Sequence, residues 1–564
     1  MDALDHLNAE QKEAVNAIEG PVLVVAGPGT GKTQILALRI GQILQLTDTD
    51  PHNILCLTYT EAGVFAMRQR LLQYIGPTAY QVQIHTFHSF GNHLIQQYRD
   101  IFGAYRDLQP ASELELITIY RQLIDQLPKD HPLKRLRGDL YFDVPRLRHL
   151  FEYMKKENLD ANAFVALLDD EIDRLLNDPD SIVTKGRRQG DIKKSVLEKI
   201  VKWEKTKYAA RLLPKYDEAL QANHRYDYGD MIQWVLKELQ RNADLLASLQ
   251  EQYLYVLVDE YQDTNGAQNA ILETLCPPAF RPNLFVVGDD DQAIFRFQGA
   301  SVQNILDFWD RYKPKVILLK ANYRSAQLIL DAAGSLIHSN LDRLVHHLHI
   351  EKNLKATGQN QKYSGAIHLT HFPNRVQEET GILHQIKRLH EEDHVPLAEI
   401  AVIYRNHKQV EDLISVMEQN LIPLSVKRKV NILQLTLIRN LRTILTFLQE
   451  EYDHPFSQDH LLFEMMHYSY FGIAPIDIAR LAKYQKEQAD LRKKQGLDEH
   501  DTLSWRALIL DSELLRVAGV AEASPILRLG ENLESWMRGV KELTLQNLFE
   551  RILKDGGILQ EILQ

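Results

Sequence analysis

Short apolar runs recur along the chain and are followed by segments with helical spacing. The runs lie at residues 22–25, 54–57, 253–258 and 284–287. Continuous runs of this kind are typical of strands that are covered on both faces. From Gln34 onward, apolar residues recur at the spacing of one helix face. Strands that alternate with helices predict an α/β fold with a parallel sheet.

A helical insertion is predicted between residues 103 and 221. The sequence there is poor in glycine, and the β-branched apolar runs are absent. Amphipathic segments lie at residues 114–127, 144–156, 163–176 and 191–207. A basic cluster in the insertion either contacts a polyanion or forms a solvated turn. Its members are Lys185, Arg187, Arg188, Lys193 and Lys194.

A second α/β unit is predicted after Pro314. Strands are expected at residues 316–319, 367–370 and 400–404. A helix near residues 378–390 separates the last two strands, and beyond about Phe447 the chain is mostly helical again. The sequence stops at Gln564 within an amphipathic pattern, without a capping residue or a polar tail. We therefore expect a fragment of a longer protein.

Composition adds little to this picture. The chain has 564 residues, of which 45% are hydrophobic, so several domain cores can form. A net charge of −11 argues against a uniformly basic nucleic-acid coat but allows a local basic groove. Only Cys56 and Cys276 are present, and neither a signal peptide nor an apolar run of about 18 residues occurs. We therefore expect a cytoplasmic protein in a reducing compartment, without membrane contact.

The first predicted strand runs into AGPGTGKT, which fits a phosphate-binding loop with Ala26 in place of the first glycine. Glycines let backbone N–H groups crowd around an anion, and the following helix N-terminus adds a favourable dipole. Lys32 supplies a charge for the β- and γ-phosphates of a nucleotide, and Thr33 supplies a hydroxyl for Mg²⁺. The predicted nucleotide-binding residues are Ala26, Gly27, Pro28, Gly29, Thr30, Gly31, Lys32 and Thr33.

Acidic and amide residues follow two later strands. Asp259 and Glu260 come directly after the run at residues 253–258. A carboxylate at the end of a central strand can hold Mg²⁺ through water, and its neighbour can orient or deprotonate an attacking water. Gln292 follows the next strand and can sense a γ-phosphate. The acidic run before it, residues 289–291, could instead bind Ca²⁺, although no ligand spacing of that type follows.

Hydroxyl and aromatic side chains near strand ends suit contacts with a single nucleic-acid strand. They are Thr86, His88, Phe295 and Phe297. Two other interpretations stay open, because aromatic pairs are more often part of a core and grouped histidines can bind a metal. The metal interpretation lacks support from a nearby cysteine or from a helical i, i+4 pair of histidines.

In this order, the motifs resemble those of the UvrD/Rep/PcrA family of superfamily 1 DNA helicases, and the resemblance covers nearly the whole chain. Seven segments carry it: residues 7–11 (Q motif), 26–33 (motif I), 57–70 (motif Ia), 86–90 (motif Ib), 258–265 (motif II), 286–300 (motif III) and 319–325 (motif IV). Motifs V and VI of the family are expected beyond Gln564.

The resemblance implies two RecA-like P-loop NTPase domains with ATP between them, each with a helical insertion and the second incomplete. Residues 1–102 and 222–312 would form RecA-like domain 1A, 103–221 its insertion 1B, 313–448 RecA-like domain 2A, and 449–564 part of helical domain 2B.

The resemblance also implies roles for the predicted site residues. Lys32, Thr33 and Asp259 would hold MgATP, and Glu260 would be the catalytic base. Gln292 would couple the γ-phosphate to DNA.

Further roles concern the other wall of the cleft and the DNA. Arg324 from the second domain would act as an arginine finger, and Tyr323 would stack on adenine. Gln11 would read the adenine edge, although taken alone it is more simply a surface glutamine. Single-stranded bases would stack on Tyr59, Phe295 and Phe297. Thr58 and Thr60, on either side of Tyr59, would contact the same strand.

Three positions depart from the family pattern. Gln34 replaces an arginine that often stacks on adenine, so looser base discrimination is expected. Phe297 and Gln298 replace the usual Trp-Arg of motif III, which keeps the stacking but loses an arginine contact. Residues 427–433 lack the Gly-Gly and Phe-Phe pattern of the family, which indicates a divergent branch.

The predicted function is that of an ATP-dependent DNA helicase or translocase that moves 3′ to 5′ along single-stranded DNA. Its cofactors would be ATP and Mg²⁺, and its partners single-stranded and partly duplex DNA. Two alternatives stay open: the motor portion of a helicase-nuclease, and a non-hydrolysing nucleic-acid-binding protein on the same fold. The intact Lys32, Glu260 and Arg324 disfavour the second alternative. A small-molecule kinase would leave the motifs between Thr58 and Phe297 unexplained.

Overall fold

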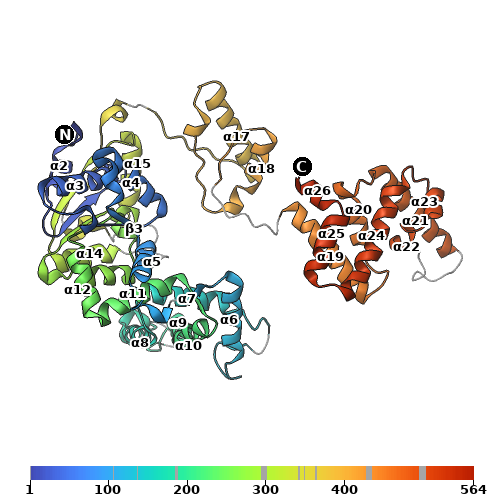
Figure 1. Ribbon diagram of the computed structural model, residues 1–564, viewed down its shortest axis with the longest axis horizontal. Coiled ribbons are helices and arrows are strands. Elements are labelled where there is room, and N and C mark those ends of the chain that lie inside the picture. Colours follow the sequence, from blue (N-terminus) through green and yellow to red (C-terminus); the bar gives the residue numbers. More distant parts are fainter. Residues whose placement is uncertain are drawn as a thin grey trace. The chain divides into compact units, whose positions relative to one another are not determined.

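The computed structural model divides the chain into two compact units (Figure 1), a first unit of residues 1–369 and a second unit of residues 370–564. It describes residues 2–105, 107–135, 138–184, 189–293, 302–340, 343–348, 350–362, 365–426, 435–494 and 504–563.

A parallel sheet of six strands forms the centre of the first unit, in the order β3-β2-β6-β7-β1-β8. The strands are β1 (Val22–Ala26), β2 (Ile54–Thr58), β3 (Gln83–Thr86), β6 (Tyr255–Val258), β7 (Asn283–Gly288) and β8 (Lys315–Leu319). All four apolar runs near the N-terminus and in the middle of the chain are strands of this sheet, and the α/β fold class is confirmed. Because the strands are parallel, their carboxyl ends meet at one edge, where ligands bind in sheets of this kind.

Two hydrophobic cores cover the two faces of the sheet, because alternate residues of a strand point to opposite faces. Val22 and Val24 of β1 enter one core, whereas Leu23 and Val25 enter the other. The first face is covered by α2 (Ala9–Asn16), α3 (Lys32–Leu46) and α4 (Glu61–Ile75). The second is covered by α5 (Phe87–Gln97), α11 (Tyr228–Arg241), α12 (Ala243–Gln252), α13 (Gly266–Leu275) and α14 (Val302–Tyr312). The short α1 (Asp2–Asp5) precedes them.

Both cysteines are free and buried in these cores. Cys56 lies on β2 in the first core, and Cys276 follows α13 in the second. Burial raises the pKa of the Cys276 thiol to about 12 and raises the pKa of the Cys56 thiol further above its ordinary value.

The predicted helical insertion is present in the first unit and gathers beside α11 (Figure 1). Its helices are α6 (Glu113–Asp125), α7 (Val144–Lys156), α8 (Ala161–Asn177), α9 (Lys194–Ala210) and α10 (Leu213–Ala222). They share a core of their own that includes Tyr120, Phe151 and Tyr216. The chain enters and leaves the insertion through β4 (Gln109–Pro110) and β5 (Arg225–Tyr226), which pair with each other.

The strand predicted at residues 316–319 is present, but it belongs to the first sheet and does not open a second one. It forms β8, which pairs with β1 along its whole length. The following elements also stay in the first unit: β9 (Ala321–Asn322), α15 (Gln327–Ile337), α16 (Leu344–Leu348) and β10 (Lys355–Ala356), with β10 pairing to β9.

The strands predicted at residues 367–370 and 400–404 are not formed, which corrects the sequence-based expectation. A strand needs a neighbour that satisfies its backbone N–H and C=O groups, and neither run has one in the described part of the chain. Some apolar side chains of both runs are left in solvent, with Leu369 at 99% and Ile403 at 95% exposure, whereas Ile400 and Tyr404 pack partly buried against a hydrophobic core of the second unit.

The second unit is helical. Helices α17 (Arg375–Glu391) and α18 (Glu411–Gln419) share one small core. A larger core, centred on Phe447, Leu481 and Trp536, holds the remaining helices. These are α19 (Thr436–Asp453), α20 (Asp459–Met466), α21 (Pro475–Lys494), α22 (Trp505–Leu508), α23 (Ser512–Val517), α24 (Ala523–Glu542), α25 (Leu545–Asp555) and α26 (Ile558–Leu563). No helix within the described ranges of the chain has the length and apolar character needed to cross a membrane.

Candidate nucleotide site

The phosphate loop, residues 26–33, connects β1 to α3 in a conformation that its glycines allow. Gly29 and Gly31 have φ values of 69° and 90°, in the left-handed region where a Cβ atom is strained. The hydroxyl of Thr30 donates a hydrogen bond of 2.8 Å to the carbonyl of Gly27 and braces the loop. The free N–H groups of the first turn of α3 therefore meet the carboxyl end of β1, as an anion site requires.

Lys32 and Glu260, which were predicted from separate motifs, form an ion pair. The Nζ of Lys32 lies 2.5 Å from the Oε2 of Glu260. Lys32 begins α3, whereas Glu260 follows β6, two strands away in the sheet. Glu260 has φ 50° and ψ 46°, a conformation that is uncommon for residues with a side chain and is concentrated at functional sites. The sheet thus holds the predicted phosphate-binding cation against the predicted base.

Three carboxylates face Lys32 at this place. Burial, helped by Glu260 and opposed by Lys32, raises the pKa of Asp259 to about 6. Burial also raises the pKa of Asp263 to about 6. Within the described residues, the Oδ1 of Asp263 is buried without a hydrogen-bond partner. A site with this excess of negative charge suits a divalent cation, and Thr33 stands in the adjacent first turn of α3.

The Q motif and Tyr323 flank the phosphate loop, although they are some 300 residues apart in the sequence. The Nδ2 of Asn8 donates to the hydroxyl of Tyr323 at 3.3 Å, and the Tyr323 N–H donates to the Gly29 carbonyl at 2.9 Å. Gln11 is only 3% exposed, so it is not a surface residue. Its Oε1 accepts the Asn8 N–H at 3.2 Å and its Nε2 donates to the Thr30 carbonyl at 2.9 Å.

Arg324 belongs to the same compact unit as the phosphate loop. The side chain of Asn322 donates to the carbonyl of Pro28, and its Oδ1 accepts the Arg324 N–H at 2.9 Å. A Cβ atom on Gly29 would lie 2.5 Å from the Cβ of Arg324, so only glycine leaves room there. Asn322 therefore anchors Arg324 to the phosphate loop. Sequence analysis missed this role, and its only signal in the sequence is an asparagine directly before a predicted functional pair. The structure shows that this asparagine is buried and hydrogen-bonded.

Gln292 lies at the end of an acidic loop, which comprises Asp289, Asp290 and Asp291. The Nε2 of Gln292 donates to the Oδ2 of Asp289 at 2.5 Å. The three carboxylates lie close enough together to hold a metal ion, which was one interpretation of the sequence. The Nζ of Lys352 instead lies among them, at 2.7 Å from Asp290 and 2.9 Å from Asp291, and it also bonds Asp289. The ammonium group of Lys352 thus occupies the space between the carboxylates, and the loop does not support a Ca²⁺ site.

The predicted nucleic-acid contacts at the ends of β2 and β3 lie next to each other. Thr58 and Thr86 are partners in the register of the two strands. Thr60 caps α4 by accepting the Gly63 N–H at 3.0 Å, and Thr86 caps α5 by accepting the Ser89 N–H at 3.0 Å. Two helix N-termini therefore point to one edge of the sheet, where Tyr59 follows Thr58. Such N-termini attract phosphate groups.

An exposed aromatic residue at this edge was not predicted from the sequence. Tyr228 begins α11 and is 68% exposed, and its backbone makes a hydrogen bond with His88. Burial and Lys156 lower the pKa of His88. An exposed tyrosine beside a predicted contact residue extends the candidate DNA surface.

The histidines near motif Ib do not form a metal site in the described residues. The rings of His85 and His93 stack at 5.2 Å, and burial together with His93 lowers the pKa of His85 to about 4. Phe295 and Phe297 lie outside the described residues, as do Lys185, Arg187 and Arg188 and residues 427–433. Lys193 and Lys194 of the basic cluster contact the Asp180 carbonyl and the Glu198 carboxylate.

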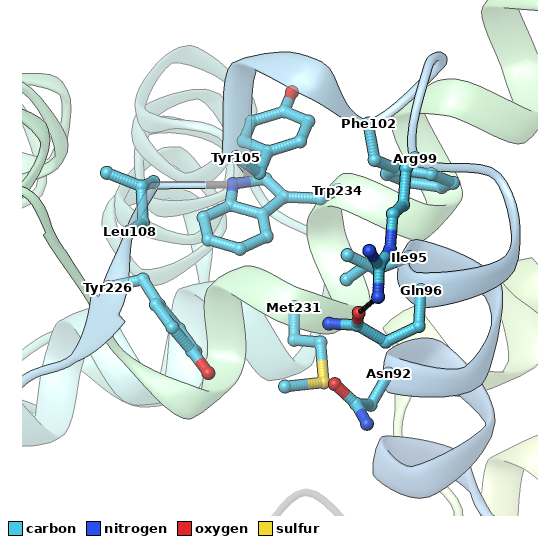
Figure 2. A pocket seen from close by; sticks show the side chains of 10 residues that line it. All are labelled: Asn92, Ile95, Gln96, Arg99, Phe102, Tyr105, Leu108, Tyr226, Met231 and Trp234. Atoms are coloured by element: carbon cyan, nitrogen blue, oxygen red, sulfur yellow. Dashed lines mark hydrogen bonds between the residues drawn. The ribbon is translucent and has the colours of Figure 1, made fainter.

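A separate cavity of about 270 Å³ lies between α5 and α11, near the entrance to the helical insertion. Figure 2 shows an aromatic wall on one side and polar side chains of α5 on the other. Tyr105 and Trp234 stack in the aromatic wall at 4.4 Å. Gln96 accepts a hydrogen bond of 3.0 Å from Arg99 in the polar wall. None of the predicted nucleotide-site residues lines this cavity.

Comparison with known proteins finds two helicase family models that match the chain. The family described as UvrD/REP helicase N-terminal domain matches residues 7–313, and the UvrD-like helicase C-terminal domain matches residues 317–489. The ATP-dependent DNA helicase PcrA of Bacillus subtilis is 29% identical over 409 residues, which cover 72% of this chain and 48% of that protein. PcrA of Staphylococcus aureus is 28% identical over 407 residues, with the same coverage. The chain therefore spans about half the length of the curated relatives that it matches.

Proposed function

The chain belongs to the UvrD/REP helicase family, and we propose that it acts as an ATP-dependent DNA helicase moving 3′ to 5′ along single-stranded DNA. The observation that carries the proposal is the ion pair between Lys32 and Glu260, beside the buried Asp259 and at the mouth of a formed phosphate loop. PcrA relatives described as ATP-dependent DNA helicases support the choice of DNA as substrate.

In the proposed mechanism, ATP phosphates replace Glu260 as the partner of Lys32. The phosphates bring more negative charge than one carboxylate and so compete for the ammonium group. Glu260 is then available to accept a proton from the water that attacks the γ-phosphate. The 2.5 Å contact supports this exchange, because both side chains already lie where the phosphates would bind.

Mg²⁺ would be held by Thr33 and Asp259, and it supplies neutralisation of the charge on the phosphate oxygens. The excess of carboxylates around Lys32 and the unpartnered Oδ1 of Asp263 fit such a cation. Asp259 serves this role in its ionised form, so a pKa of about 6 favours binding of the metal–nucleotide complex above that pH.

The remaining nucleotide contacts follow from the elements that surround the loop. Arg324 contributes positive charge to the transferring phosphoryl group, and Tyr323 stacks on the adenine. Gln11 reads the adenine edge after its amide releases the carbonyl of Thr30, with which it now pairs. Gln292 senses the γ-phosphate and relays its presence to the DNA surface.

The DNA single strand would follow the edge of the sheet at the N-termini of α4 and α5. Backbone phosphates would meet the helix N-termini, and bases would stack on aromatic side chains such as Tyr59 and Tyr228. The nucleotide cleft would close on ATP and open after hydrolysis, and this cycle would move the strand along the surface. Partly duplex DNA ahead of the moving protein would be separated.

The test uses the full-length protein, with ATP turnover measured with and without single-stranded DNA. Wild-type turnover is expected to rise sharply with DNA. Lys32→Ala and Glu260→Gln should each lower the stimulated rate by about 10²-fold or more, because each removes a group that acts on the phosphates. The exposed Lys12→Ala and Glu19→Gln serve as matched controls that keep the rate. Turnover that ignores DNA would contradict the proposal.

Direction is tested separately by placing a fluorophore at either end of a single strand. Arrival of the protein at the 5′ end, and not at the 3′ end, is the expected result for movement from 3′ to 5′. Arrival at the 3′ end would reverse the assignment without affecting the ATPase proposal.

A further inference from the structure

A continuous chain of polar contacts leads from the phosphate loop to the acidic loop. Lys32 pairs with the Oε2 of Glu260, and the same oxygen accepts the Nε2 of Gln262 at 2.8 Å. The Oε1 of Gln262 accepts the N–H of Asp289 at 2.9 Å. The Asp289 carboxylate in turn accepts the Nε2 of Gln292 at 2.5 Å. The two ends of the candidate nucleotide site are thus connected by a series of direct hydrogen bonds, one of which uses the backbone N–H of Asp289.

Lys352 lies at the far end of this series of hydrogen bonds and is deeply buried. Its side chain is 2% exposed, and those of Asp289 and Asp290 are 0% exposed. One carboxylate oxygen of Asp289 bonds Lys352 while the other bonds Gln292. A buried carboxylate that lost its cation would be left uncompensated, so Lys352 fixes the position of the group that holds Gln292.

Lys352 lies in a segment that follows β8 and β9 in the sequence and contacts the sheet's loops again. The described residues of this segment are 343–348 and 350–357. Arg343 makes two hydrogen bonds of 2.7 and 2.8 Å with Asp291, and the Leu344 N–H donates to Asp290 at 2.8 Å. Two residues after Lys352, the Leu354 side chain covers the phosphate loop, where a Cβ on Gly27 would lie 2.7 Å from its Cδ1. One short segment therefore touches the acidic loop and the phosphate loop together.

We propose that Lys352 is a positioning residue for the coupling between nucleotide binding and DNA binding. Through Asp289 it sets the position of the Gln292 amide. Through Leu354 it links that amide to the conformation of the phosphate loop. The inference rests on the proposed function, since it assumes that ATP and DNA binding are coupled. Lys352 itself contacts neither phosphate nor DNA in this scheme.

Coupling is measured with the full-length protein and a fluorescent oligothymidylate. The readout is the ratio of the DNA Kd with ADP to the DNA Kd with a non-hydrolysable ATP analogue. Wild-type ratios of about 5 to 150 are expected for coupled sites, in either direction. In Lys352→Met the ratio should fall close to one, whereas the affinity for the ATP analogue without DNA should change less than about threefold. The exposed Lys355→Met, on the same segment, is the matched control.

A double-mutant cycle separates positioning from a merely structural role. If Lys352 acts through Gln292, then Lys352→Met should cause no further loss of coupling in a Gln292→Ala background. Independent, additive losses would overturn the proposal. Because Lys352→Met leaves buried carboxylates unpaired, Lys352→Met with Asp290→Asn restores the net charge of the cluster. The isosteric Asp289→Asn cuts the same link and should lose coupling as well.

The outcomes distinguish this inference from the proposed function. A wild-type protein whose DNA affinity ignores the nucleotide contradicts the proposed function. A wild-type protein that couples, together with Lys352→Met/Asp290→Asn and Asp289→Asn variants that couple equally well, contradicts the role of Lys352 alone.

Discussion

Asp259 illustrates a conflict between stability and function at a single residue. Its pKa of about 6 in the folded chain lies above the ordinary value of 3.8, chiefly because of burial. The folded state therefore binds more protons than the unfolded state between these values, and the ionised carboxylate lowers stability as pH rises through them. This cost is fully present above about pH 6.

Asp259→Asn is accordingly expected to raise the free energy of unfolding at pH 8 by about 2–3 kcal/mol, from two pKa units at about 1.4 kcal/mol each. The amide keeps an oxygen that can accept the Glu260 N–H, which now bonds the Oδ1 of Asp259. Denaturant unfolding at pH 8 and at pH 4 measures the effect, which should nearly vanish at the lower pH. Nucleotide binding with Mg²⁺ should be lost. A variant that is less stable at pH 8 would contradict the assigned burial cost.

Two glycines, Gly288 in a crowded position and Gly334 in an open one, offer a second test on single residues. A Cβ on Gly288 would lie 2.9 Å from the Oε1 of Gln262, which bonds the acidic loop. Gly288→Ala should therefore cost about 1–3 kcal/mol through overpacking. Gly334 lies within α15, and outside the helix's own backbone no heavy atom of the described residues lies within 4 Å of the added Cβ. Gly334→Ala should stabilise the helix by about 1 kcal/mol. Thermal unfolding of both variants checks the signs, and equal effects would contradict this account.

At the scale of elements, a buried lysine joins the helical insertion to α11. The Nζ of Lys155 on α7 lies 2.8 Å from Asp217, 2.8 Å from Asp227 and 2.5 Å from Asp230. Asp217 is on α10, whereas Asp227 and Asp230 cap and begin α11. Burial, opposed by Lys155, raises the pKa of Asp230 to about 7. The cluster therefore fixes three helices to one another.

Lys155→Met should destabilise the first unit by about 3–5 kcal/mol at pH 8, because it leaves buried carboxylates without a cation. The loss should shrink toward pH 5, where protonation of Asp230 reduces the uncompensated charge. Limited proteolysis and thermal unfolding at both pH values measure it. Lys194→Met, at a position 83% exposed, is the matched control and should be neutral. A loss that does not depend on pH would argue that Lys155 contributes through packing alone.

Elements were predictable from the sequence where their cause is local. The runs that form β1, β2, β6 and β7 are apolar along their length, and the phosphate loop is defined by its own glycines. The position of β8 in the sheet could not be predicted from the sequence, because β8 pairs with β1, which lies almost 300 residues away. For the same reason, the sequence around Lys352 does not predict its contact with Asp289, which lies 63 positions away. The runs at 367–370 and 400–404 are apolar enough for strands, but neither pairs with a strand among the described residues.

At the scale of the whole molecule, the predicted nucleotide contacts that the structure describes all belong to the first unit. Lys32, Glu260, Gln292 and Arg324 lie within residues 1–369, which have their own sheet and cores. A protein of residues 1–369 is therefore expected to fold and to bind a fluorescent ATP analogue within about tenfold of the affinity of the full chain, a difference of about 1.4 kcal/mol. Fluorescence titration measures it.

Lys32→Ala in the same shortened protein should abolish that binding, and Lys12→Ala should not. A shortened protein that is folded by circular dichroism but binds no nucleotide would place an essential contact in residues 370–564.

The burial of Cys56 and Cys276 has a practical consequence for labelling. Both thiols are out of reach of solvent and their pKa values are raised, so the reactive thiolate is scarce at neutral pH. A thiol reagent should therefore react slowly with the native chain and with both sulfurs only after denaturation. An added cysteine on an exposed surface, such as Glu19→Cys, would become the fast-reacting thiol without removal of the native pair. The two native thiols should therefore contribute little labelling when a dye is attached to an added cysteine.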